Sequence, residues 1–224
     1  MSGVFAYYKN NIDGLLLRVS QAPSTGMPNN PLMNIGEMYN QGIEITLNAT
    51  PVSQKDFRWN TSFNLSTNKN EVTKLAPGVP FITNVTGLET ANITMPGYAL
   101  GYFYLLPTAG VDPQTGRRIF INNAGEKILY NHAGPTGQKY TYMKDGTVAP
   151  AIDPGKDQKP MYNPLPRIYG GFDNTFTYKN FDLNVLITYQ AGFYVYNGTQ
   201  ATIRDQRFWN NEKAVLNRWK NQVI

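Results

Sequence analysis

Few residues in this sequence have the types and spacing that catalysis requires. His132 is the single histidine, and it lies in a Pro- and Gly-rich stretch that offers no partner for acid–base chemistry. The stretch 134–139, GPTGQK, superficially resembles a phosphate-binding loop. That loop needs four residues between its glycines and a Ser or Thr after the lysine, so we interpret 134–139 as a turn. We expect no catalytic residue, no cofactor and no enzymatic activity.

Oxygen-bearing side chains occur together between residues 112 and 126. Asp112, Asn122, Asn123 and Glu126 have the ligand chemistry that calcium prefers, but their spacing does not match an EF-hand loop. Because Asp and Asn are also common turn residues, we interpret these four as turn residues and predict no metal site. The sequence has no cysteine, which excludes thiolate metal sites and cysteine nucleophiles.

Aromatic side chains in irregular stretches are the more useful candidates for ligand binding. Their rings could stack on a sugar or a peptide, although we expect about half of them only to pack the loops. The candidate ligand-facing residues are Tyr102, Tyr104, Tyr142, Tyr162 and Trp209.

The element that organises the chain is a predicted β-hairpin over residues 166–189. Two stretches of alternating apolar and polar residues flank the pair Lys179-Asn180, which we expect to form the turn. The predicted register makes one face apolar and the other polar, with Asn174 and Leu186 as the two exceptions. The pairs that this register predicts are Tyr178 with Phe181, Phe176 with Leu183, Phe172 with Ile187, Thr177 with Asp182, and Thr175 with Asn184.

The rest of the chain also has the pattern of an all-β protein. Strands are predicted at 4–17, 36–50, 57–69, 167–178 and 181–196, with shorter strands within 98–121 and a short helix at 205–220. The connections alternate between long (18–34, 70–164) and short (51–56, 179–180). Long strands that alternate in this way are typical of a transmembrane barrel, but a soluble sandwich also accounts for the alternation within each strand.

Composition is typical of an outer-membrane barrel, and Tyr-rich binding proteins can have the same composition. The chain has 224 residues and is 41% hydrophobic but only 16% charged, with 13% aromatic residues. The net charge of +5 comes from scattered residues rather than a basic stripe, so we expect no nucleic-acid partner. No stretch is long and apolar enough for a membrane helix, and strand-like residues follow Met1 at once with no signal peptide. A barrel must be exported, so in that reading we expect the natural N-terminus to lie upstream.

Aromatic residues flank both short turns, which is where a barrel places them at the membrane interface. These residues are Phe57, Trp59, Tyr178 and Phe181.

Three blocks resemble the SusC/RagA type of TonB-dependent outer-membrane transporter of Bacteroidetes. They are NIGEMYNQGIE at 34–44, FRWNTSFNLSTNKN at 57–70, and the stretch from Pro166 to Leu183 that closes on Gly192. The stretch GVDPQTG at 110–116 with Asn123-Ala124-Gly125 is similar to a loop pattern of that family. The resemblance covers about 190 residues and includes nothing like the plug, the TonB box or the first barrel strands.

The resemblance implies an antiparallel, up-and-down arc of roughly six strands from a 22-strand transmembrane barrel, which six strands cannot close. It implies uptake of a glycan or peptide across the cell outer membrane, with TonB supplying energy and a SusD-like lipoprotein covering the extracellular face. Residues 70–164 and 18–34 would be extracellular loops.

The same resemblance implies which side chains would meet outer-membrane lipid. Those facing lipid would be Ile43, Ile45, Leu47, Phe63, Leu65, Phe172, Phe176, Leu183, Val185 and Ile187. Those facing the lumen would be Glu44, Asn48, Asn60, Asn64, Asp173 and Asp182. The alternative is a soluble all-β module that binds carbohydrate or protein and buries the apolar face between two sheets. A β-rich hydrolase is disfavoured, because no pair of carboxylates can be placed at a working distance.

Overall fold

The computed structural model describes residues 1–18, 23–26, 31–86, 89–205 and 210–220. The chain divides into two compact units. The first consists of Met1–Asn84, Ile93–Phe103 and Tyr162–Val195, and the second of Val85–Asn92, Tyr104–Met161 and Tyr196–Ile224.

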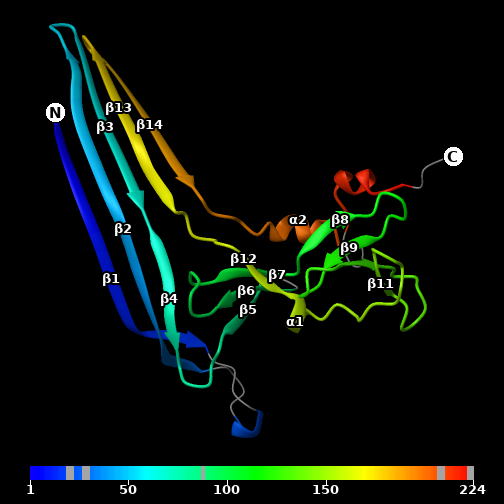
Figure 1. The fold of residues 1–224 in the computed structure, drawn as a ribbon. Coiled ribbons are helices and arrows are strands. Elements are labelled where there is room, and N and C mark those ends of the chain that lie inside the picture. The colour runs from blue at the N-terminus through cyan, green and yellow to red at the C-terminus, as the bar shows by residue number, and fades with distance from the viewer. Residues whose placement is uncertain (19–22, 27–30, 87–88, 206–209, 221–224) are drawn as a thin grey trace. The chain divides into compact units, whose positions relative to one another are not determined.

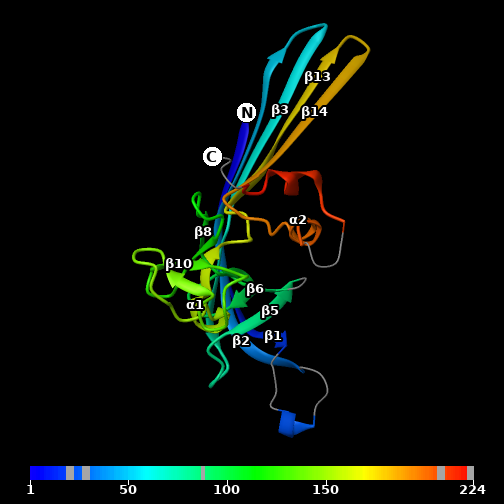
Figure 2. The same ribbon diagram turned by 90° about the vertical axis from the view of Figure 1, so that its right-hand side faces the viewer.

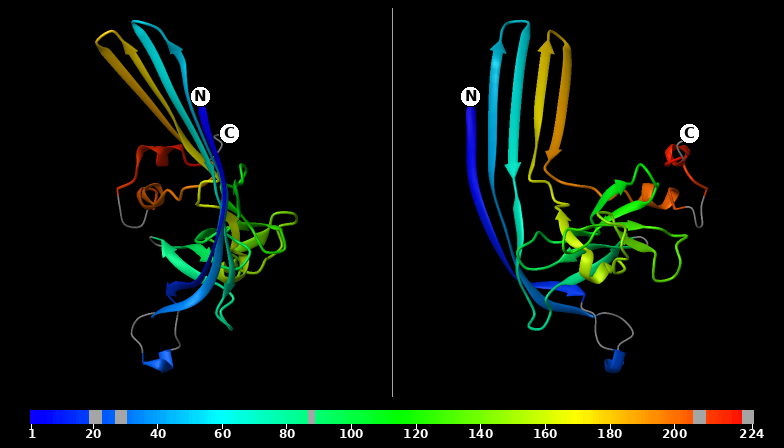
Figure 3. Two further views of the ribbon diagram at one scale, coloured as in Figure 1. Left: turned by 90° about the vertical axis from the view of Figure 1, so that its left-hand side faces the viewer. Right: turned by 45° about the vertical axis from the view of Figure 1, so that its right-hand side comes forward.

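The first unit is built on one antiparallel sheet (Figure 1). Its strands follow the order β1-β2-β3-β13-β14, and β4 pairs with the far part of β2. The strands β1 and β2 bend along their length, and the part of the sheet near the short turns is a single layer (Figures 2 and 3). The bounds are β1 Ser2–Arg18, β2 Leu32–Ser53, β3 Phe57–Thr67, β4 Lys69–Leu75, β13 Ile168–Tyr178 and β14 Phe181–Ala191.

The predicted hairpin register is confirmed. Tyr178 lies opposite Phe181, and all four other predicted pairs occur in the ladder between β13 and β14. Lys179 has a positive φ of 53°, a backbone conformation that this tight turn requires and that is unusual for a residue other than glycine. Its backbone N–H donates to the carbonyl oxygen of Asp56 at 2.9 Å, so the turn between β13 and β14 is tied to the turn between β2 and β3.

Some strand ends differ from the predicted ones. The strand predicted at 36–50 continues to Ser53 across a bulge between Ala49 and Val52, and Pro51 lies inside that bulge. A bulge tolerates proline because it interrupts the ladder of backbone hydrogen bonds. The strand predicted at 181–196 ends earlier, at Ala191, because Gly192 turns the chain with a φ of 77°.

Strand β4 begins at Lys69, where the long loop 70–164 was expected to start. It pairs with β2 from Gln41 to Gly36, with a register shift near Met38. Because of this shift Val72 and Leu75 lie on the same side although they are three residues apart. Together with Met38 they form a buried cluster, against which Leu15, Leu17, Val79, Ile82 and Leu100 pack.

The second unit contains a four-stranded sheet in the order β11-β10-β9-β8. Another four-stranded sheet follows the order β12-β7-β6-β5. The bounds are β5 Ile82–Thr86, β6 Glu89–Thr94, β7 Tyr102–Leu105, β8 Thr108–Val111, β9 Arg118–Ile121, β10 Lys127–Tyr130, β11 Tyr140–Tyr142 and β12 Lys159–Tyr162.

The helical segments are short. They are the 3₁₀ turns η1 (Pro23–Thr25) and η2 (Lys213–Asn217) and the helices α1 (Pro154–Asp157) and α2 (Gly198–Ile203). The helix predicted at 205–220 is wrong for the described part of that range, which contains only η2. The helix α2 forms earlier instead, because the Asn197 side chain caps it by accepting from the N–H of Gln200.

Candidate functional site

The long sheet of the first unit has two chemically distinct faces. The ladders place all ten residues predicted to face lipid on one face, which we name the apolar face. All six residues predicted to face the lumen share the opposite, polar face: Glu44, Asn48, Asn60, Asn64, Asp173 and Asp182. Across the polar face the Asn184 side chain donates to Asp173 and to Thr175, and Thr50 donates to Asn60.

Large side chains on the apolar face remain open to the surroundings. Leu183 is 60% exposed and Ile187 is 53% exposed. Ile45, Phe63 and Phe176 are only partly buried and do not belong to the buried cluster around Val72. A sandwich would bury such residues against a second sheet, so the exposed apolar face is the main functional observation.

The four aromatic residues predicted at the short-turn end do gather there. Tyr178 lies opposite both Phe57 and Phe181 in the ladders. The ring of Trp59 stacks on Phe176 with centroids 5.7 Å apart. These rings form an aromatic border at one limit of the apolar face.

At the other limit, near Gly42, the apolar face becomes charged and the polar face becomes apolar. Beyond Ile43 the apolar face continues as exposed charged residues of β4, and the side chains of Lys69 and Lys74 are 60% and 65% exposed. On the opposite face the polar row gives way to the buried cluster of Met38, Val72 and Leu75. The exposed apolar surface is therefore a band with two ends. On β3 this band runs from Phe57 to Thr67, which is 11 residues.

Asn174, one of the two exceptions in the predicted hairpin, lies inside this band and is buried. Its side-chain oxygen accepts hydrogen bonds from Trp59 Nε1 at 3.0 Å and from Thr61 Oγ1 at 2.9 Å. The polar groups of the three side chains satisfy one another, which explains how an amide is tolerated among apolar residues. The other exception, Leu186, is 60% exposed on the polar face.

We expect Asn174→Ala to lower the free energy of unfolding by about 1–3 kcal/mol, because Trp59 and Thr61 lose their shared acceptor. Thermal unfolding in detergent, followed by tryptophan fluorescence, measures the change. Asn184→Ala is the matched control, because its exposed hydrogen bonds should be worth less than about 0.5 kcal/mol. Equal losses for the two variants would show that the buried network contributes nothing special.

Two tyrosines, each opposite a glycine on the neighbouring strand, donate hydrogen bonds to the backbone of β3. Tyr189 lies opposite Gly170, and its hydroxyl donates to the carbonyl oxygen of Asn64 at 2.8 Å. Tyr8 lies opposite Gly42, and its hydroxyl donates to the carbonyl oxygen of Thr67 at 3.2 Å. In both cases the phenol bridges from an outer strand to β3, two strands away, and glycine leaves the space for it.

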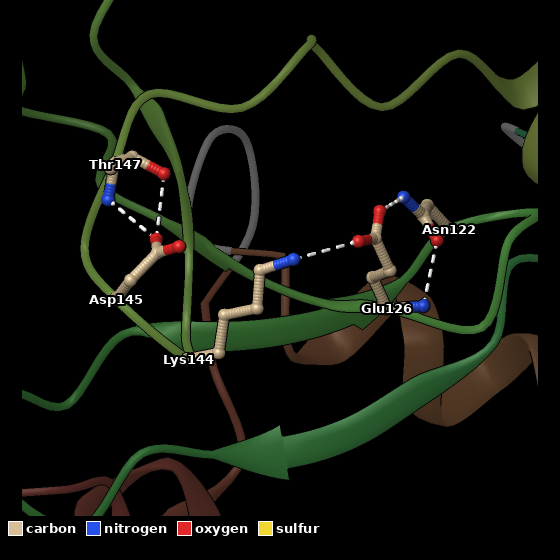
Figure 4. Close-up of polar contacts among 5 residues, drawn as sticks. All are labelled: Asn122, Glu126, Lys144, Asp145 and Thr147. Atoms are coloured by element: carbon tan, nitrogen blue, oxygen red, sulfur yellow. Dashed lines mark hydrogen bonds and ion pairs between the residues drawn. The ribbon is translucent and has the colours of Figure 1, made fainter.

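Several polar residues of the second unit make turn and ion-pair contacts with one another (Figure 4). The Glu126 carboxylate accepts a hydrogen bond from the Asn122 side-chain amide at 3.0 Å and another from Lys144 Nζ at 3.1 Å. These two contacts lower the pKa of Glu126, with the Asn122 hydrogen bond as the larger cause. Asp145 accepts from the N–H and the hydroxyl of Thr147, which lowers its pKa as well.

The residues whose side chains could have bound calcium also make hydrogen bonds within the protein. Asp112 accepts from the hydroxyl and N–H of Thr115 and from the N–H of Gln114, and these bonds lower its pKa. The N–H of Asn123 donates to Asp157 at 2.8 Å. Within the described residues no group of three His, Asp or Glu side chains could hold a metal ion.

The remaining motifs have simple structures. His132 is exposed, and its Nδ1 lies 3.0 Å from the hydroxyl of Tyr130. In the stretch 134–139 the N–H of Gln138 donates to the carbonyl of Pro135, so the interpretation as a turn is confirmed. Among the described helices, none has the length and apolar character needed to cross a membrane.

The candidate loop aromatics do not form one common cluster. Tyr102 packs edge-on against Tyr98 at 5.1 Å, and Tyr162 lies 4.3 Å from Tyr194, both in the first unit. In the second unit Lys144 Nζ lies over the ring of Tyr142 at 4.8 Å, and the backbone oxygen of Tyr104 accepts from Gln158. Trp209 lies outside the described residues.

Sequence reasoning missed a pocket of 670 Å³ in the first unit. Among the candidate aromatics that the structure describes, only Tyr102 lines it. Its other walls come from residues of β2 and β4 and from the segments around Tyr98 and Arg167. The only signal in the sequence was the density of Asn, Gln and Tyr on these segments.

No protein-family model matches the chain. TonB-dependent receptor P3 of Formosa agariphila is 31% identical over 200 residues, which is 87% of this chain and 19% of the relative. TonB-dependent receptor SusC of Bacteroides thetaiotaomicron is 29% identical over 205 residues, 87% of this chain and 18% of the relative. The chain thus spans about a fifth of the length of these relatives.

Solved structures of the RagAB peptide transporter have the same fold. One of these structures aligns with 97% of this chain, and the aligned part is 22% of the solved chain. The TM-score is 0.75 and the sequence identity is 22%. The structure of the RagAB peptide importer in the "open-open" state aligns with 85% of this chain, and the aligned part is 18% of the solved chain. The TM-score is 0.63 and the sequence identity is 22%. The antiparallel sheet therefore corresponds to a section of that larger fold.

Proposed function

Because the chain is a relative of TonB-dependent receptors, SusC among them, over 87% of its length, we propose that its sheet is an arc of a transmembrane barrel in the outer membrane. In this arrangement the apolar face meets lipid and the polar face lines the water-filled lumen. The chain then serves as a wall section of a nutrient importer rather than as an enzyme.

The observation that carries this proposal is the exposed apolar band with its two ends. Its aromatic border lies at the short turns, and its other end lies near Gly42, where charged residues begin. The band on β3 is 11 residues long. A tilted strand needs about 9–11 residues to cross a bilayer, so the band has the length of one crossing.

The finer parts of the proposal follow from the relatives. Import would be energised by TonB and would proceed with a SusD-like lipoprotein on the extracellular side. The substrate would be a glycan or a peptide, and the RagAB structures are named as those of a peptide transporter. Partly buried rings of the second unit, such as Tyr142, would lie on the extracellular side, where an incoming substrate first makes contact.

Single cysteines test the assignment of the two faces, because the chain has no cysteine of its own. We expect a membrane-impermeant maleimide to label Thr46→Cys and Thr188→Cys on the polar face in intact outer membranes. Leu47→Cys and Ile187→Cys should instead react only with a lipid-soluble maleimide. The protein should also require detergent for extraction from the membrane.

The alternative, a soluble binding module, gives the opposite pattern. The protein would be released without detergent, and Leu47→Cys and Ile187→Cys would be shielded from both reagents until the protein is unfolded. Labelling of both faces by the impermeant reagent would also contradict the barrel, since no face would then be covered by lipid.

A further inference from the structure

Beyond the apolar band, the first row of side chains on the same face carries two lysines and a glutamine. Lys9 of β1 and Lys69 of β4 both lie opposite Gln41 of β2, so the three residues are neighbours across the sheet. We name these three residues the lysine row. The row before it, toward the short turns, contains Tyr7 opposite Ile43, and these side chains are 61% and 38% exposed. The last apolar residues of the band therefore adjoin two ammonium groups and an amide.

Acidic side chains of this face lie one and two rows farther from the band. Glu71 lies opposite Tyr39 in the next row. Glu37 lies opposite Asp13 and Lys74 in the row after that. An anionic group that is attached to an apolar tail on the band therefore reaches the lysine row before it reaches these carboxylates. This order of charges along the face favours an anion at the lysine row over one farther from the band.

The ring of Tyr39 brings the ends of the two lysines to one level of the sheet. Lys9 Nζ lies 5.4 Å and Lys69 Nζ 5.6 Å from the centroid of this ring. The Tyr39 hydroxyl donates to the Glu71 carboxylate at 2.8 Å, and Lys69 Nζ pairs with the same carboxylate at 2.8 Å. Lys9 is exposed and makes no ion pair among the described residues. The charge of Lys9 is therefore the one that remains for an external anion.

We propose that the lysine row binds the phosphate of a glycolipid in the outer leaflet, whose acyl chains lie on the apolar band. The inference rests on the proposed function, because it needs the band to lie in hydrocarbon and the end away from the short turns to be extracellular. The acyl chains would contact Tyr7 and Ile43, and the phosphate would accept hydrogen bonds from Lys9 and from the amide of Gln41. All these residues lie on one face of the sheet, so one lipid can contact them together.

The test uses the protein purified from its native outer membrane and placed in phosphatidylethanolamine nanodiscs that contain lipid A. We expect native mass spectrometry to find lipid A retained on the protein. Lys9→Gln should weaken this retention about fivefold, which is the effect of one basic residue near an anionic lipid surface. Lys9→Arg should retain lipid A as the unchanged protein does, because it keeps the charge. The matched control is Lys74→Gln, which removes an exposed lysine of the same face two rows farther from the band and should leave retention unchanged.

Two further probes separate the lipid phosphate from other ligands. Dephosphorylated lipid A should be retained about fivefold less well than lipid A, and inorganic phosphate should not displace lipid A. Equal retention of the dephosphorylated lipid would overturn the role of the phosphate, and displacement by inorganic phosphate would overturn the lipid as its source.

The lysine variants decide whether the site is the lysine row. Equal retention in Lys9→Gln and in the unchanged protein, or an equal loss in Lys9→Gln and Lys74→Gln, would overturn it. If cysteine labelling places the apolar face in lipid while these retention results fail, the barrel assignment stands and only this inference falls. If the labelling itself contradicts a lipid-covered face, the proposed function falls and this inference falls with it.

Discussion

Gly170→Ala is expected to prevent stable assembly of the sheet, while Gly171→Ala, one residue away, is tolerated. A methyl group at Gly170 would lie 2.1 Å from the carbonyl oxygen of Asn64 and 2.6 Å from the hydroxyl of Tyr189. The first of these atoms belongs to the backbone of β3 and cannot move without breaking the ladder. We expect a loss of about 3 kcal/mol or more in the free energy of unfolding.

The neighbouring glycine is a strict control. At Gly171 the nearest atom to an added methyl group is Asn64 Nδ2 at 3.3 Å, which is the end of a flexible side chain. We expect that variant to assemble with a cost below about 1 kcal/mol. The amount of folded, detergent-resistant protein in the outer membrane and its unfolding temperature measure both effects. Similar behaviour of the two variants would mean that β13 does not approach β3 in the described way.

Gly42→Ala should repeat the severe result, because its methyl group would lie 1.8 Å from the carbonyl oxygen of Thr67. Tyr8→Phe tests the same lock more gently, since it removes only the hydroxyl that donates to Thr67 and Asn68. We expect this second change to cost about 1 kcal/mol.

Leu47→Arg should cost about 2–4 kcal/mol in barrel stability, because it places a charge near the middle of the band that we assign to lipid. Leu47 lies opposite Gly3 and Phe63, in the interior of the apolar face, and is 41% exposed. Val185→Arg on β14 should have an effect of the same size. Urea titration of the protein in lipid vesicles measures the difference.

Thr46→Arg is the matched control, because it introduces the same side chain one residue along, on the polar face opposite Asn64. We expect this variant to differ from the unchanged protein by less than about 0.5 kcal/mol, since water reaches the lumen. If arginine is tolerated equally at both positions, the apolar face does not meet hydrocarbon. If it is destabilising at both, the sheet is covered on two sides and the soluble alternative gains support.

The hairpin could be predicted because its signals are local and agree with one another. Alternation with period two, a two-residue turn and aromatic cross-strand neighbours all specify one register for β13 and β14. The partition of side chains between two faces follows from the same alternation. The six residues predicted for the polar face, of which Glu44 is the first and Asp182 the last, do share one face in the ladders.

What could not be predicted depends on contacts between distant segments. The register shift in the pairing of β2 with β4 puts Val72 and Leu75 on one side, so the strand does not show period two in sequence. The pocket is formed by segments around residues 41, 68, 98 and 163, which only the fold brings together. The helix predicted at 205–220 was favoured by amphipathic spacing, but in its described part the chain takes only one short 3₁₀ turn.

The two outer strands of the long sheet, β1 and β14, each have one side without a strand partner in the described ladder order. In the proposed barrel further strands would pair there, but in this sheet taken alone the outward N–H and C=O groups of the two strands are a template for strand addition by other copies of the chain. Because the five strands alternate in direction, β1 and β14 run the same way, so an antiparallel extension pairs β14 with the β14 of a second copy and β1 with the β1 of a third, and such contacts can repeat without end. At high concentration this sheet, without neighbours to cap its margins, is therefore expected to grow into open-ended ribbons.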